Sequence, residues 1–142
     1  MFEFELGEIN YVAVLAAGLA AFMLGGLWYT ALFGRLWREL QGITEEKVKE
    51  MQARRPPLVF FGGMMASYSV LALAIAVLFA GLGVDSAVKG AVAGLLLWIG
   101  PAAAIGMTGH LASDKPIGVY AIDVSFQFLY LILMGTILGG WR

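Results

Sequence analysis

The chain has 142 residues, of which 61% are hydrophobic and 13% are charged, and its formal net charge is −1. Soluble domains contain about 45–50% apolar and about 25% charged residues, so this composition excludes an ordinary soluble protein. The lack of cysteine and the single histidine exclude disulfides, thiolate metal centres and multi-histidine zinc sites within one chain. The charge balance also gives no electrostatic footprint for nucleic acid.

Four long runs of the sequence contain no Asp, Glu, Lys or Arg. They cover residues 9–34, 56–84, 90–113 and 124–141. A helix needs about 20 apolar residues to cross roughly 30 Å of hydrocarbon. We therefore predict an all-α integral membrane four-helix bundle, built from two antiparallel helical hairpins and forming a single domain over residues 1–142. The spans are expected at about residues 9–33, 58–84, 90–113 and 117–140.

The basic residues indicate how the spans are oriented. Seven of the nine lie on one side of the predicted membrane: Arg35, Arg38, Lys47, Lys49, Arg54, Arg55 and Lys115. Lys89 and Arg142 lie on the other side. The positive-inside rule therefore predicts a multi-pass protein of the cell (inner) membrane, with the 34–55 loop cytoplasmic and both termini outside. Residues 1–8 carry three glutamates and no basic residue, so we expect the first span to be retained rather than cleaved as a signal peptide.

The only sizeable polar segment is the loop over residues 34–57. Its first part predicts an interfacial amphipathic turn in which Leu36 and Trp37 face the membrane. Thr44 is expected to cap a short amphipathic helix, which ends before Pro56. The loop is either a docking site for anionic lipid or a partner, or an ordinary basic anchor with an interfacial tryptophan, and the second interpretation is favoured.

Small residues recur at multiples of four along every span. They are Ala17, Ala21 and Gly25, then Ala72, Ala76 and Ala80, then Gly90, Gly94, Ala102 and Gly106, and finally Gly135 and Gly139. Such stripes let helix backbones approach closely, within one chain or between copies. Because the stripes leave a spare face on a four-helix bundle, we expect a homo-oligomer.

A proline lies near the middle of the third span. Pro101 removes one backbone hydrogen bond, so the sequence predicts a kink there. Kinks in membrane helices serve either as hinges or as fixed shape, and the fixed interpretation is favoured because neighbouring groups satisfy the freed carbonyl.

Polar side chains inside the spans gather in the half nearest the predicted cytoplasm. The candidates for a buried polar network or a ligand site are Asp123, His110, Gln127, Tyr29, Trp28, Ser67, Ser69 and Tyr130. Asp123 lies about 9 Å into the fourth span, where a charged side chain must face the bundle interior. The short turn at residues 114–116 brings His110 to a similar depth, so we consider a hydrogen bond between the two reasonable.

Two interpretations of these polar residues stay open. They line a pocket open to the cytoplasm, with Asp123 as a proton- or cation-binding carboxylate tuned by His110, or they form a closed network that fixes helix register. The sequence does not choose between the two for Asp123. For Trp28 and Tyr29, an interfacial aromatic belt is the favoured interpretation.

The sequence resembles an uncharacterised bacterial family over nearly its whole length. The most specific stretch is Gly-Leu-Trp-Tyr-Thr-Ala-Leu-Phe-Gly-Arg-Leu-Trp at residues 26–37, followed by Gly-Ile-Thr-Glu-Glu at 42–46. These motifs, the acidic Asp123 and the final Gly-Gly-Trp-Arg are similar to domain-of-unknown-function family 1761. One departure is Ala31, where many relatives carry proline. The resemblance implies a small four-span membrane protein and implies no activity or catalytic residue.

The sequence therefore predicts a structural or accessory membrane protein that binds membrane partners or itself. It contains no paired carboxylates, nucleophile–base pair or metal cluster, so we do not expect an enzyme or a cofactor. The alternative is a small oligomeric proton- or cation-coupled transporter with Asp123 as the carrier carboxylate. The expected partners are the lipid bilayer and either further copies of the chain or other membrane proteins, with no nucleic acid.

Overall fold

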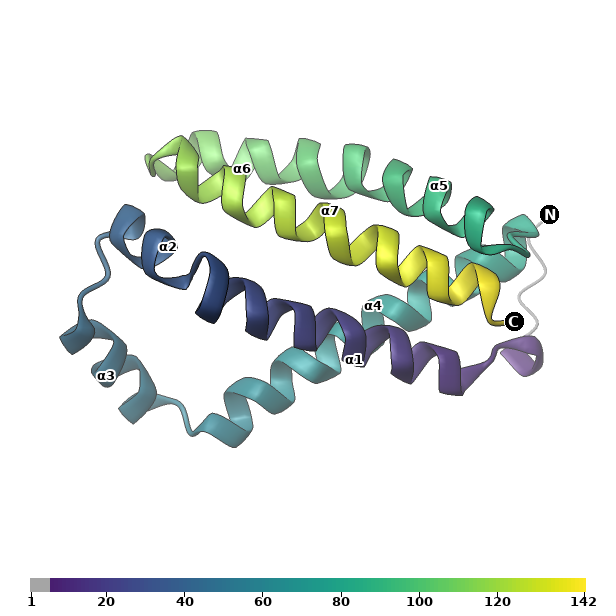
Figure 1. Cartoon of the computed structure of the whole chain (residues 1–142), viewed down its shortest axis with the longest axis horizontal. Coiled ribbons are helices and arrows are strands. Elements are labelled where there is room, and N and C mark those ends of the chain that lie inside the picture. The colour runs from purple at the N-terminus through teal and green to yellow at the C-terminus, as the bar shows by residue number, and fades with distance from the viewer. Residues whose placement is uncertain (1–5) are drawn as a thin grey trace.

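The computed structural model describes residues 6–142, which form long helices lying side by side (Figure 1). Within these residues, four helical segments are long and apolar enough to cross a membrane, namely Tyr11–Leu32, Pro57–Leu82, Ala87–Ser113 and Ile117–Gly140. No strand occurs in this part of the chain. The predicted all-α fold is confirmed, and the predicted spans differ from these bounds by three residues or fewer. Two of the three N-terminal glutamates lie in residues 1–5, outside the described part.

The helical elements follow one another with short connections. In chain order they are η1 (Leu6–Glu8), α1 (Tyr11–Leu27), η2 (Trp28–Leu32), α2 (Gly34–Gln41), α3 (Glu45–Arg54), α4 (Pro57–Leu82), α5 (Ala87–Leu97), η3 (Trp98–Ala104), α6 (Ile105–Ser113) and α7 (Ile117–Gly140). The first span thus comprises α1 and η2, and the third comprises α5, η3 and α6. The first described residues, Leu6–Glu8, and the C-terminus lie at one end of the molecule, whereas α2 and α3 lie at the opposite end (Figure 1).

Local sequence explains where several helices begin and end. The side chains of Asn10, Thr44 and Ser86 accept hydrogen bonds from backbone N–H groups three residues later, at 3.1, 3.2 and 3.3 Å. These bonds satisfy N–H groups that have no partner inside the helix, and the predicted cap at Thr44 is confirmed. Gly42 and Gly83 end α2 and α4 with φ of 68° and 67°, a left-handed conformation that glycine adopts without steric cost.

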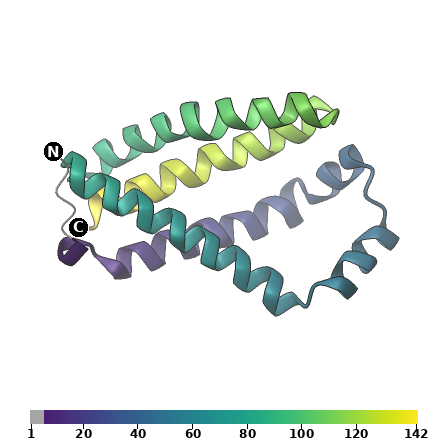
Figure 2. The ribbon, with the colours of Figure 1, turned by 180° about the vertical axis from the view of Figure 1, so that it is seen from behind.

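The helix α7 occupies the centre of the bundle. It contacts α5 on one side and α1 on the other, and α4 packs mainly on α1 (Figures 1 and 2). The largest fully buried side chains are Phe79 and Met134, and the main apolar core lies toward the end that holds the C-terminus. Toward the other end α4 diverges from α1 (Figure 2), and residues 57–64 are all exposed. The bundle is therefore tight at one end and open at the other.

The closest approach between helices joins α5 to α7. A Cβ atom built on Gly90 would collide with the carbonyl oxygen of Gly135, and one built on Gly94 would lie 2.9 Å from the carbonyl carbon of Leu131. A Cβ atom built on Gly139 would likewise lie 2.9 Å from the Cα atom of Gly90. The small size of these four glycines therefore allows close contact between α5 and α7. The sequence left open whether such contacts form within one chain or between copies, and for these glycines they form within the chain.

The irregularity expected at Pro101 takes the form of a π-helical segment. Pro101 lies inside η3, between α5 and α6. A proline has no N–H to donate and its ring crowds the preceding turn, and a wider turn accommodates both effects. The third span nevertheless continues through η3 to Ser113.

Candidate functional site

The carboxylate of Asp123 is held by two aromatic side chains from the other end of the sequence. Tyr29 Oη donates a hydrogen bond to Asp123 Oδ1 at 2.5 Å, and Trp37 Nε1 donates to the same oxygen at 2.9 Å. Tyr29 comes from η2, Trp37 from α2 and Asp123 from α7. The contact therefore ties the end of the first span to the last span.

The helix is interrupted between η2 and α2, and this interruption lets Tyr29 and Trp37 donate to the same oxygen atom of Asp123. The π-helical turn closes when Phe33 N–H donates to the carbonyl oxygen of Trp28 at 2.8 Å. Phe33 then leaves helical geometry, with φ −121° and ψ 0°, and α2 begins at the buried Gly34. A Cβ atom at Gly34 would collide with the carbonyl oxygen of Tyr29. Glycine is therefore required where the chain folds back on the preceding turn.

Aromatic rings surround the Asp123 contact. The buried ring of Phe126, one turn along α7, lies 5.2 Å from Tyr29 and 4.9 Å from Tyr130 between ring centroids. Trp28 lies 6.3 Å and Tyr68 6.4 Å from the same ring. Three of these pairs are edge-to-face, an arrangement that aromatic rings favour. The cluster adjoins the carboxylate, because Tyr29 belongs both to the cluster and to the Asp123 contact.

Two tryptophan side chains from neighbouring segments donate hydrogen bonds to the backbone of α7. Trp28 Nε1 donates to the carbonyl oxygen of Ile122 at 3.1 Å, and Trp98 Nε1 donates to that of Val124 at 2.8 Å. A helical carbonyl has a second lone pair free to accept such a bond. Trp28 and Tyr29 thus both bond to α7, and their place in an interfacial aromatic belt stays a prediction.

His110 does not join the Asp123 contact. Its ring packs on Tyr120, with 5.5 Å between centroids, and Tyr120 Oη donates to the carbonyl oxygen of Ala103 at 2.7 Å. Tyr120 therefore occupies the face of α7 that is turned toward α6, whereas Asp123 is turned toward α2. The expected hydrogen bond between His110 and Asp123 is wrong for this reason.

The remaining candidate residues do not bond to Asp123. One belongs to the ring cluster, and the serines bond within their own helix. Tyr130 belongs to the cluster, and Gln127 lies half-buried on α7, one turn from Asp123. Ser67 and Ser69 donate to carbonyl oxygens four residues earlier on α4, at 2.8 and 2.9 Å. A serine that satisfies itself in this way has no need of a distant partner. Within residues 6–142, no group of three or more His, Cys, Asp or Glu side chains could hold a metal ion.

Trp37 lies elsewhere than the sequence predicts. The hydrophobic pattern of residues 36–40 turns Trp37 toward the membrane together with Leu36, but its ring is half-buried and bonded to Asp123. An indole N–H inside a bundle needs an acceptor, and a carboxylate inside a span needs donors. This need of a donor for an acceptor could have paired Trp37 with Asp123. The sequence does not reveal it, because the direction of Trp37 depends on the interruption of the helix at Gly34.

A cavity of about 730 Å³ lies next to this contact, between α2, α3 and the start of α4. Trp37 forms part of its wall, whereas neither Asp123 nor Tyr29 lines it. Trp37 thus has one side toward the cavity while its nitrogen is engaged by Asp123. The polar contact and the cavity are neighbours that share a single side chain.

A comparison with protein-family models matches residues 12–139 to the family described as protein of unknown function (DUF1761). The chain belongs to this family. The match includes Tyr29, Trp37 and Asp123, so all three members of the contact lie in the family's domain. Searches of curated proteins and of solved structures gave no match. Membership in DUF1761 therefore confirms the family resemblance seen in the sequence.

Proposed function

We propose that this DUF1761 protein is a structural or accessory membrane protein that acts by binding membrane partners or further copies of itself, and that Asp123 is a structural residue. The observation that supports this role is the pair of donors on one carboxylate oxygen, from Tyr29 and Trp37. A carrier carboxylate must exchange a proton or cation with water, and two rigid ring donors compete with that exchange. Within the described residues, no buried side-chain nitrogen or oxygen lacks a hydrogen-bond partner, as expected for a closed network.

The spare surface that supports a binding role is the first half of α4. Leu58 is 84% exposed and Val59 63%, and a Cβ atom built on Gly62 or Gly63 would meet nothing within 4 Å. Small residues on an open helix face allow a second membrane helix to approach closely. A homo-oligomer in the cell membrane fits this surface, and its size is measured by light scattering of the purified protein in detergent.

The test of the proposal separates a structural carboxylate from a carrier. Asp123→Asn keeps one acceptor oxygen for Tyr29 and Trp37, whereas Asp123→Leu keeps none. We expect Asp123→Leu to lower the free energy of unfolding by about 3 kcal/mol, because two half-buried donors lose their partner, and Asp123→Asn to lower it less. Thermal unfolding in detergent measures this order.

Proton flux in proteoliposomes completes the test. We expect the native protein, Asp123→Asn and a control, Asp85→Asn, to give the same flux as empty liposomes. Asp85 is exposed and pairs with Lys89 at 2.7 Å, so its replacement removes a carboxylate without touching the bundle interior. A flux that the native protein supports and that only Asp123→Asn abolishes would establish the carrier role and overturn the proposal.

A further inference from the structure

The cavity between α2, α3 and the start of α4 has a basic rim. Four of the residues that line it carry a positive charge, namely Arg38, Lys47, Arg54 and Arg55, and none of the described lining residues is acidic. Its volume of about 730 Å³ falls within the range of about 300–1,000 Å³ that is typical of ligand pockets. The charge of the rim favours an anion.

The four positive charges of this rim are only partly neutralised by acidic side chains of the chain. Glu50 lies 4.0 Å from Lys47 and 3.7 Å from Arg54, and all three side chains are more than half exposed. No ion pair within residues 6–142 involves Arg55. Exposed pairs of this kind hold each other weakly. An incoming anion therefore meets more positive charge than one glutamate cancels.

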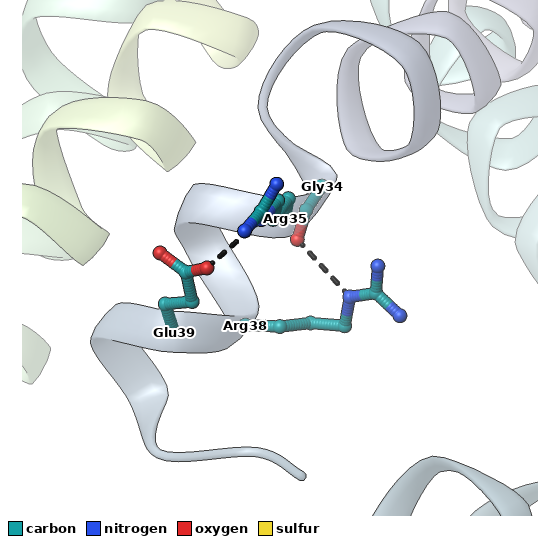
Figure 3. Close-up of polar contacts among 4 residues, drawn as sticks. All are labelled: Gly34, Arg35, Arg38 and Glu39. Carbon is teal, nitrogen blue, oxygen red and sulfur yellow. Dashed lines mark hydrogen bonds and ion pairs between the residues drawn. The ribbon is translucent and has the colours of Figure 1, made fainter. Parts of the chain in front are cut away.

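The two arginines of α2 have different hydrogen-bond partners. Arg35 forms an ion pair with Glu39 at 3.0 Å, outside the cavity, whereas Arg38 donates through Nε to the carbonyl oxygen of Gly34 at 3.2 Å. Figure 3 shows the guanidinium of Arg38 extending away from the Arg35–Glu39 pair, with its two terminal nitrogens beyond the Gly34 bond. These nitrogens can donate to a phosphate oxygen in the bidentate geometry that guanidinium favours.

The wall of the cavity is apolar. Trp37, Phe60 and Phe61 contribute rings to it, and Phe60 and Phe61 are 43% and 54% exposed. A soluble anion would leave these rings in contact with water, whereas an acyl chain would cover them. The cavity also lies where the first span ends and the second begins at Pro57, the depth at which lipid headgroups lie.

We propose that this cavity binds one anionic phospholipid of the bilayer. Its phosphate lies among Arg38, Lys47 and the two arginines that end α3, and its glycerol and first acyl carbons lie against the aromatic wall. The occupant is a lipid rather than a free phosphate because the basic rim and the apolar wall belong to one cavity. This inference does not depend on the role of Asp123.

The test uses Trp37 as a reporter, because its ring lines the cavity. The protein is placed in phosphatidylcholine nanodiscs that contain either phosphatidylglycerol or phosphatidylcholine with brominated acyl chains, and bromine quenches tryptophan fluorescence on contact. The Trp37 signal is the difference between the native protein and Trp37→Phe. At equal bromine content we expect stronger quenching of this signal by the anionic lipid.

Matched variants then separate the cavity from the general basic surface. Each basic residue near an anionic surface contributes about fivefold in affinity, so Arg38→Gln with Arg55→Gln should weaken binding of the anionic lipid about twenty-fivefold. Arg35→Gln with Lys49→Gln removes the same charge from the same helices but not from the cavity, and should leave binding within about twofold of native. Arg38→Lys with Arg55→Lys keeps the charge but not the bidentate guanidinium geometry, and should restore part of the binding.

Three results would overturn the proposal. Equal quenching by the two brominated lipids would show that the cavity does not select an anion. An equal loss in the Arg35 and Lys49 control would assign the effect to the basic surface as a whole. Displacement of the brominated lipid by inorganic phosphate would assign the cavity to a soluble anion. Circular dichroism and size-exclusion profiles check that each variant is folded. If the glutamine variants do not fold, the lysine variants still test the role of the guanidinium groups.

Discussion

A carboxylate inside a membrane span is stable only when donors replace the water that it loses. Asp123 meets this condition through Tyr29 and Trp37, which lie 94 and 86 positions away in the sequence. Asp123 and Tyr29 could be predicted as candidates because polar residues are rare in these spans. Their pairing could not, because the direction of each side chain depends on the break at Gly34.

Removal of one donor tests this contact at the residue scale. We expect Tyr29→Phe to lower the free energy of unfolding by about 1–3 kcal/mol, because the Asp123 carboxyl group loses one of its two donors. Tyr11→Phe is the control, since Tyr11 Oη donates at 2.9 Å to the carbonyl oxygen of Leu6 in an exposed position, and should cost less. Equal losses in detergent unfolding experiments would contradict a special role for the Asp123 contact.

At the scale of elements, the pairing of α5 with α7 depends on glycine. The sequence predicted close helix contacts from the spacing of small residues, and the structure assigns Gly90, Gly94, Gly135 and Gly139 to one such contact within the chain. The spacing alone could not make this assignment, because a stripe on one helix fits a stripe on any other of similar length. Helix caps such as Thr44 were predictable because they involve neighbouring residues only.

An added methyl group tests the contact between α5 and α7. We expect Gly94→Ala to lower the free energy of unfolding by about 1–3 kcal/mol, because the new Cβ would press on the backbone of α7 at Leu131. Gly109→Ala is the matched control in the same span, where a Cβ meets nothing within 4 Å and the change should be neutral or slightly stabilising. Unfolding of the two variants under identical detergent conditions measures the difference, and no difference would contradict the contact.

At the scale of the whole molecule, the two ends of the bundle are unlike. The end that holds the C-terminus is packed around Phe79 and Met134, whereas the basic cavity lies at the opposite end, beside α3. Seven of the nine basic residues belong to the predicted cytoplasmic side. The positive-inside rule therefore predicts that the open end faces the cytoplasm.

Cysteine labelling tests this orientation, because the chain has no cysteine of its own. Lys49→Cys lies on α3 and Arg142→Cys at the C-terminus, at opposite ends of the molecule (Figure 1). We expect a membrane-impermeant maleimide applied to intact cells to label Arg142→Cys and to leave Lys49→Cys unlabelled until the membrane is opened. The reverse pattern would contradict the predicted topology.

The sequence by itself determined the four spans, their boundaries and the presence of a charge in the last one. These properties depend on hydropathy and on residues close together in the chain, so composition and spacing suffice to read them. Only the tertiary structure decided that Asp123 faces Tyr29 and Trp37 rather than His110, and that basic and aromatic side chains share one cavity. The rotation of each helix about its axis and the break at Gly34 set these contacts, and both depend on packing between segments distant in the sequence.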